Sequence, residues 1–244
     1  MLLLHGLAGY AGEWARSARL LRDHYRIYAL DQRGHGDSTQ RPKDVSRAAL
    51  VADCAAIIRA IGLGPVTLVG QSMGASTALL TAAAHPDLVR SLVIIEGSPD
   101  GPASPDPDPE AARQIGASLK AWPVPFTDPA AARVFFNSKG FDPDAWTEGL
   151  DTRPDGLWPR WDPETLAACV ADLQSRNYWP QWRTIQAPTL VILGENGIFP
   201  SGHGENIVNQ LPRSTLVIVP DAGHDVHLDA PEAWVGALRC SPAR

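Results

Sequence analysis

Short apolar runs, separated by longer amphipathic stretches, recur along the whole chain. Six of these runs predict strands, at residues 2–4, 26–30, 66–70, 91–96, 189–194 and 215–219. Nearly continuous apolar runs are typical of parallel strands, because helices cover both faces of a parallel sheet. We therefore expect one central sheet whose strands are buried on both sides.

The stretches between these runs predict helices, at residues 14–21, 47–61, 75–84 and 231–238. In the second of these, apolar side chains recur at Val51, Cys54, Ile58 and Ile61, which places them on one face of a helix. Strands that alternate with helices predict an α/β fold, with a mostly parallel sheet flanked by helices.

This alternation stops between residues 98 and 185. Residues 98–109 contain so many prolines that neither a helix nor a central strand can form there, and we predict a linker. Residues 110–184 carry six of the eight tryptophans, and no sheet strand is predicted until residue 189. We predict a core formed by residues 1–100 and 185–244, with residues 101–184 forming the Pro-rich linker and a helical cap.

Composition narrows the choice of partners. The chain has 244 residues, 44% of them hydrophobic, and a formal net charge of −6 without a Lys/Arg cluster. These values disfavour nucleic acid or an anionic membrane surface as a partner and favour a small-molecule substrate. Three widely spaced cysteines indicate free thiols in the cytoplasm, and the opening Met-Leu-Leu-Leu run indicates a core strand and not a signal peptide. The chain is expected to be a monomer or a homodimer.

The pentapeptide Gly70-Gln71-Ser72-Met73-Gly74 carries the strongest chemical signal. It follows a predicted strand and opens a predicted helix, so Ser72 lies at a sharp strand-to-helix turn. Glycines two residues to either side let the strand and the helix approach each other closely. This context predicts an exposed serine nucleophile.

Four motifs in order along the chain resemble those of the α/β-hydrolase superfamily: His5-Gly6-Leu7-Ala8-Gly9, the segment 31–38, the Ser72 turn, and Gly223-His224. The resemblance implies a site at the C-terminal edge of the sheet, with a cap inserted after the strand that follows the Ser72 helix. Family members usually have an antiparallel hairpin before the strand that bears His5-Gly6. This sequence begins at that strand, so either its start is late or the hairpin is missing and an edge is exposed.

A serine hydroxyl needs a base within hydrogen-bond reach. His224 follows the predicted strand 215–219, where the family places its catalytic histidine, and we predict that it is the base. His227 is the competitor three residues later, although its apolar neighbours indicate packing. His203, in a glycine-flanked loop, is expected to be solvated.

The acid that orients the histidine departs from the commoner family pattern. Many relatives carry an aspartate three residues after a glycine in the loop after the penultimate strand, and here that position is Gly197. Haloalkane dehalogenases and zearalenone-lactone hydrolases show a second solution, with the acid at the end of the strand that follows the helix after the nucleophile. Glu96 ends that strand here, after four apolar residues, and an unpaired buried carboxylate would be costly. We predict Glu96 as the acid, with Glu195 as the alternative.

Two backbone amides are expected to form an oxyanion hole, those of Met73 at the helix N-terminus and Leu7 after His5-Gly6. Trp14, Trp122 and Trp179 are the tryptophans expected to contact substrate. The chain is thus predicted to be a serine hydrolase that cleaves a carboxylic ester or lactone of a small hydrophobic molecule, without a metal or cofactor. The alternatives are C–C or amide hydrolysis or acyl transfer by the same residues, or a non-catalytic ligand-binding relative.

Overall fold

A computed structural model describes residues 1–100 and 109–243 of the chain. Its centre is a six-stranded sheet in the order β2-β1-β3-β4-β7-β8, in which every neighbouring pair is parallel. The strands are β1 (Leu2–Leu4), β2 (Tyr28–Leu30), β3 (Val66–Gln71), β4 (Val89–Ile95), β7 (Thr189–Gly194) and β8 (Ser214–Val219). The predicted fold class is confirmed, and strand β2 forms the edge of the sheet next to β1.

Alternate side chains of the strands feed two separate hydrophobic cores. On one face, Leu3, Val69 and Val93 pack with Trp14 and Trp234. The opposite face buries another set, which includes Leu2, Leu68, Ile94, Val191 and Trp182. This two-sided burial explains why the strands read as continuous apolar runs.

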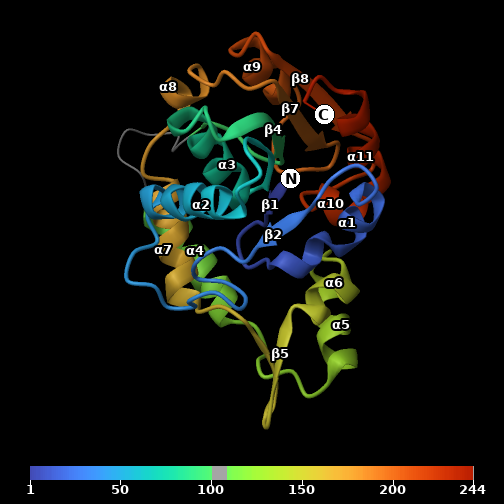
Figure 1. Ribbon diagram of the computed structural model, residues 1–244. Helices are drawn as coiled ribbons and strands as arrows, with labels where there is room; N and C mark the ends of the chain where they lie inside the picture. The colour runs from blue at the N-terminus through green and yellow to red at the C-terminus, as the bar shows by residue number, and fades with distance from the viewer. Residues whose placement is uncertain (101–108, 244) are drawn as a thin grey trace.

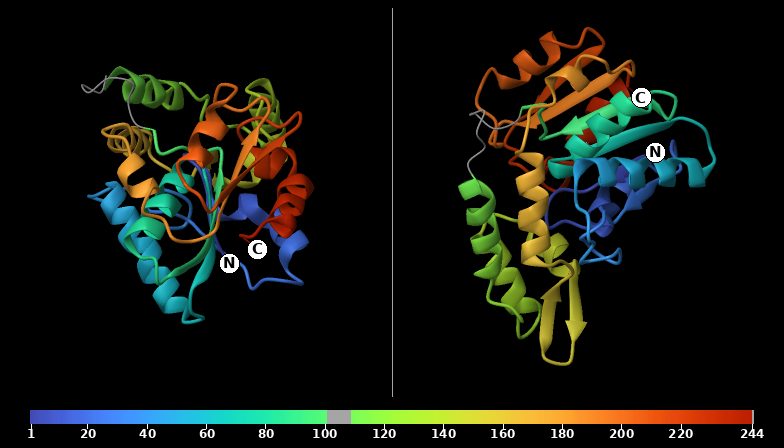
Figure 2. Two further views of the ribbon diagram at one scale, coloured as in Figure 1. Left: turned by 90° about the horizontal axis from the view of Figure 1, so that it is seen from above. Right: turned by 90° about the vertical axis from the view of Figure 1, so that its left-hand side faces the viewer.

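Helices cover both faces (Figure 2, left). α1 (Ala15–Leu21), which follows the 3-10 turn η1 (Ala11–Trp14), contacts α11 (Pro231–Cys240) on one face. The other face carries α2 (Arg47–Ile61), α3 (Met73–Ala84), α8 (Trp179–Trp182) and α9 (His203–Asn209). Helix α9 was not predicted, because its seven residues give too short an amphipathic pattern to distinguish it from a loop. The short helix α10 (Val226–Asp229) leads into α11.

The inserted segment projects from one end of the core (Figure 1). It contains α4 (Pro109–Lys120), α5 (Pro129–Ser138), α6 (Pro143–Glu148) and α7 (Pro163–Leu173), and α4 and α7 lie side by side (Figure 2, right). An antiparallel hairpin of β5 (Leu150–Arg153) and β6 (Gly156–Pro159) lies between α6 and α7, where only helices were expected. Residues 101–108 of the predicted linker lie outside the described residues, and the division at residues 100 and 185 stays a prediction.

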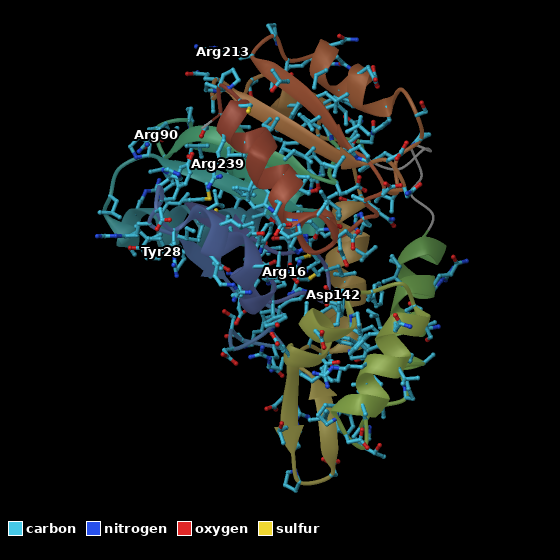
Figure 3. The ribbon with its side chains drawn as sticks, turned by 90° about the vertical axis from the view of Figure 1, so that its right-hand side faces the viewer. Arg16, Tyr28, Arg90, Asp142, Arg213 and Arg239 are labelled. Carbon is cyan, nitrogen blue, oxygen red and sulfur yellow. The ribbon has the colours of Figure 1, made fainter. Side chains whose placement is uncertain are left out.

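Two kinds of contact join the inserted segment to the core. Arg47 on α2 is buried, and its backbone amide donates to Asp172 on α7 at 2.6 Å while its Nε lies 3.3 Å from the same carboxylate oxygen. Elsewhere the junction is more exposed: Arg16 and Asp142 lie 3.7 Å apart (Figure 3), and the Tyr10 hydroxyl donates to the Ala145 carbonyl at 3.0 Å. No helix among the described residues has the length and apolar character needed to cross a membrane.

Gly74 is the point of closest approach between α3 and β1. A methyl group there would overlap the carbonyl oxygens of Leu4 and His5, which are backbone atoms that cannot rotate away. We predict that Gly74→Ala lowers the free energy of unfolding by about 1–3 kcal/mol, the usual cost of overpacking. Thermal denaturation followed by circular dichroism measures this. Gly236→Ala is the matched control, because that position in α11 has open space and should keep or raise the melting temperature; equal melting temperatures for both variants would contradict the prediction.

Candidate active site

Ser72 lies between the end of β3 and the start of α3. Its backbone has φ 51° and ψ −115°, a conformation that non-glycine residues rarely adopt. The amide of Ser72 donates to the Ile95 carbonyl at 2.9 Å, which ties the turn to the neighbouring strand. The predicted sharp turn therefore projects the hydroxyl beyond the C-terminal edge of the sheet.

His224 lies in the loop between β8 and α10. Its Nε2 lies 2.9 Å from the Ser72 Oγ. Its Nδ1 lies 3.1 Å from the Oε2 of Glu96, whose side chain is fully buried. The structure therefore brings the three predicted residues, Ser72, His224 and Glu96, into one hydrogen-bonded chain.

Two backbone amides fix the Glu96 carboxylate. Gly194 N, at the end of β7, donates to Oε1 at 2.8 Å, and Ile198 N, in the loop that follows β7, donates to Oε2 at 3.0 Å. These two bonds hold the carboxylate with Oε2 facing His224. Gly197, the position at which many relatives carry their acid, packs directly against this carboxylate. The Glu96 side chain, directly after β4, thus fills the space that a side chain at position 197 would otherwise take.

The alternative residues have other partners. Glu195 is exposed, and its Oε2 accepts the Asp221 amide at 3.0 Å. His227 is buried, stacks on Trp14 at 4.4 Å and lies 3.1 Å from Glu13. Burial disfavours its charged form, but the Glu13 carboxylate, with Asp225 and Asp229, outweighs that effect and raises the pKa of His227. His227 therefore contacts a buried carboxylate in the core and does not line the cavity that contains Ser72.

The expectation for His203 was wrong. His203 begins α9, its ring stacks on Phe199, and its Nε2 lies 3.1 Å from Ser98 Oγ and 3.0 Å from Asp100 Oδ2. These contacts keep most of its side chain out of solvent.

Backbone strain is concentrated around these residues. Among the described residues, the non-glycine positions with positive φ are Ala8, Ser72, Glu96 and Asp221. They lie in the four segments that carry the predicted oxyanion loop, nucleophile, acid and histidine. Strain of this kind persists only where the surrounding structure enforces it, and it is common in active sites.

The amides of Leu7 and Met73 are available to a ligand. Met73 N is in the first turn of α3, where an amide has no acceptor within the helix. Within residues 1–100 and 109–243, no acceptor is found for Leu7 N either. Leu7 and Met73 both line the cavity that contains Ser72 and His224.

This cavity has a volume of about 710 Å³, within the range of small-molecule sites. Core loops supply a polar wall near Ser72, made by Gln71, Asn196, His224, Asp225 and Asp229. The inserted segment supplies mostly apolar residues: Ile115, Leu119, Trp122, Phe141, Trp146, Cys169, Val170 and Leu173, together with Lys139 and Gln174.

Of the three tryptophans expected to contact substrate, the structure places only Trp122 in the cavity wall. Trp14 was placed wrongly: it is 1% exposed and packs on His227 and Trp234 in the core. Trp179 is also outside the lining, since it packs on the core and its Nε1 donates to Asp100 at 2.9 Å. Asp225 and Asp229 were missed, although their closeness in sequence to His224 is a signal that could have found them.

A family model for the α/β hydrolase fold matches residues 1–231. This chain belongs to the α/β hydrolase fold family. The mouse sn-1-specific diacylglycerol lipase ABHD11 is 32% identical over 98% of this chain and 79% of its own length. The 2-(acetamidomethylene)succinate hydrolase of Mesorhizobium japonicum is 28% identical over 98% of this chain and 86% of its own length.

Solved structures agree. A crystal structure of E-2-(acetamidomethylene)succinate hydrolase matches with a TM-score of 0.85 at 28% identity, over 98% of this chain and 89% of the other. A marine microorganism esterase matches with a TM-score of 0.76 at 26% identity, over 98% and 93% of the two chains. The α/β hydrolase described here is, like these relatives, a hydrolase.

Because Gly197 packs on Glu96, a substitution at position 197 tests whether the predicted acid must keep its contact with His224. We predict that Gly197→Ala keeps the fold but lowers kcat/KM at least about tenfold, because a methyl group would displace the Glu96 carboxylate from His224. Steady-state kinetics on an ester that the wild type hydrolyses measure this, with Gly236→Ala as the control. Wild-type kcat/KM in Gly197→Ala would contradict the prediction.

Proposed function

We propose that this hydrolase cleaves a carboxylic ester or lactone by way of an acyl-enzyme. The observation that carries the proposal is the hydrogen-bonded chain from Ser72 Oγ through His224 to Glu96, which opens onto a cavity beside two available amides. This is the arrangement that nucleophilic acyl transfer requires: a nucleophile, its base, an orienting acid and donors for the oxyanion.

In the proposed reaction, Ser72 Oγ attacks the substrate carbonyl carbon and its proton passes to His224 Nε2. Negative charge develops on the carbonyl oxygen and is stabilised by the amides of Leu7 and Met73. The carbonyl then re-forms, the bond to the leaving oxygen breaks, and His224 returns the proton to that oxygen. Water next attacks the acyl-enzyme with His224 again as the base, which frees Ser72 and releases the carboxylic acid. Glu96 holds the imidazole and stabilises its charged form.

The cavity supports a substrate with an apolar portion. The wall formed by α4 and α7 is largely aliphatic, and Trp122 and Trp146 extend it. An acyl or alkyl group would bury its apolar surface against this wall, which favours binding. The polar groups gather on the core side, around Ser72 and His224. We therefore place the scissile carbonyl at the core wall and the apolar portion against the inserted segment.

A second candidate uses the same residues on another bond. Relatives named for hydrolysis of 2-(acetamidomethylene)succinate share this fold, so amide or C–C hydrolysis, and acyl transfer, stay alternatives to ester hydrolysis. A purely ligand-binding role is the weaker alternative, because a strained serine held against a base has no purpose in simple binding. Within residues 1–100 and 109–243, no group of three His, Cys, Asp or Glu side chains is placed to hold a metal.

Two variants of similar chemistry distinguish the acids. Glu96→Gln should lower kcat by a factor of about 100 or more, because the amide cannot stabilise the imidazolium that forms during reaction. Glu195→Gln should change kcat less than about threefold, since that side chain is exposed and contacts the Asp221 amide. Steady-state kinetics decide between them, and a larger loss in Glu195→Gln would reverse the assignment.

The nucleophile is tested by treating the protein with a fluorophosphonate and measuring its intact mass. We expect one adduct on the wild type and none on Ser72→Ala, because only an activated serine reacts at this centre. The wild type should then hydrolyse p-nitrophenyl esters or lactones in a substrate panel. An adduct without ester or lactone hydrolysis would favour the alternative bonds, and a folded wild type without an adduct would favour a binding role.

A further inference from the structure

Gln71 is the last residue of β3 and directly precedes Ser72. Its side chain is almost fully buried, with the residue 2% exposed. The Nε2 atom donates to the backbone carbonyl of His224 at 3.0 Å and to Asp225 Oδ1 at 3.3 Å. One amide group at the end of β3 thus bonds to two consecutive residues of the loop between β8 and α10 (residues 220–225), called the histidine loop below.

The same side chain also contacts the oxyanion loop. Its Oε1 packs against Gly6, so closely that a methyl group on Gly6 would overlap it. Gly6 directly precedes Leu7, which lines the cavity and whose amide is a predicted oxyanion donor. Gln71, itself next to Ser72, therefore touches two further segments of the site: the loop that contains Gly6 and Leu7, and the loop that contains His224.

Other bonds fix the residues on either side of His224. The Gly223 amide donates to Asp229 at 2.8 Å, the Ala222 carbonyl accepts the Asn196 amide at 2.9 Å, and the Asp225 carbonyl accepts the Leu228 and Asp229 amides at 2.7 and 2.9 Å. In the part of the chain that the structure describes, Gln71 is the donor to the His224 carbonyl itself. The His224 side chain is one-third exposed, so its packing alone does not fix the ring.

We propose that Gln71 is a positioning residue, which holds the backbone of His224 so that the imidazole stays in line between Ser72 and Glu96. This rests on the function proposed above and identifies which side chain, besides Glu96, orients the base. The side chain at position 71 also has to be uncharged, because it bonds to the His224 carbonyl and to the carboxyl group of Asp225. Burial raises the pKa of Asp225, and a second carboxylate at position 71 would face the same buried group.

The experiment compares Gln71→Met with the wild type. Methionine has a similar length but no amide, so it removes both hydrogen bonds with little change in volume. We expect kcat on a neutral p-nitrophenyl ester to fall by about tenfold to a hundredfold, KM to change less than about threefold, and the fluorophosphonate labelling rate to fall in parallel with kcat. Gln186→Met, at an exposed glutamine outside the cavity, should retain wild-type values.

A second pair of variants tests the hydrogen bond itself. Gln71→Glu places an acceptor opposite two acceptors and should lose more kcat than Gln71→Met. Adding Asp225→Asn supplies a new donor to the introduced carboxylate, and we expect the double variant to recover at least about fivefold of the lost kcat. Both proteins in this comparison carry Gln71→Glu, so the comparison stands even if Gln71→Met is too unstable to purify.

The outcomes separate the hypotheses. Wild-type kcat and labelling rate in Gln71→Met would overturn the proposal, and so would a raised KM with unchanged kcat, which would make Gln71 a substrate contact. A double variant no better than Gln71→Glu would also count against it. If the wild type is labelled at Ser72 but hydrolyses no ester, the ester proposal fails while the labelling rates still test Gln71.

Discussion

The buried carboxylate of Glu96 is the constraint on which the site depends. A charge without solvent is costly unless it is fully paired, and Glu96 is paired by the His224 ring and by the amides of Gly194 and Ile198. Those partners come from the end of β7, from the loop after it and from the loop after β8. In the sheet, β7 lies next to β4, and β8 lies next to β7. Satisfying one side chain therefore fixes the relative positions of two loops, and it requires a residue without a side chain at Gly197.

The parallel sheet makes such an arrangement possible. Because β1, β3, β4, β7 and β8 run in the same direction, the loops that follow β1, β3, β4 and β8, which carry Leu7, Ser72, Glu96 and His224, emerge at a single edge. The strained backbone at Ala8, Ser72, Glu96 and Asp221 lies in these same loops, where the well-packed core on both faces of the sheet can enforce it. The well-packed strands thus form the core, and the strained residues lie in the loops that follow the strands.

Features set by local pattern could be predicted from the sequence. The apolar runs predicted the strands because burial on both faces leaves little room for polar residues, and Glu96 was recognisable because a carboxylate after four buried positions needs a partner. Trp14 and Trp179 were placed wrongly because a tryptophan that fills a core and one that lines a cavity have the same local pattern. Only the packing of η1 on α10 and of α8 on the core decides between these roles. The β5–β6 hairpin was missed because each strand has only four residues, too few for a clear alternation of apolar and polar positions.

The two walls of the cavity differ in how firmly they are held, and this difference bears on specificity. The core wall is fixed by backbone hydrogen bonds and by the contacts of Glu96 and Gln71. The opposite wall belongs to a segment that is joined to the core by the largely buried Arg47–Asp172 pair and by the more exposed pairs Arg16–Asp142, Arg41–Asp162 and Arg160–Asp37. Exposed ion pairs contribute little to stability, whereas breaking a buried one is costly. We therefore expect substitutions in α4, α7 or the aromatic residues between them to alter which molecule fits the cavity while Ser72, His224 and Glu96 keep their positions.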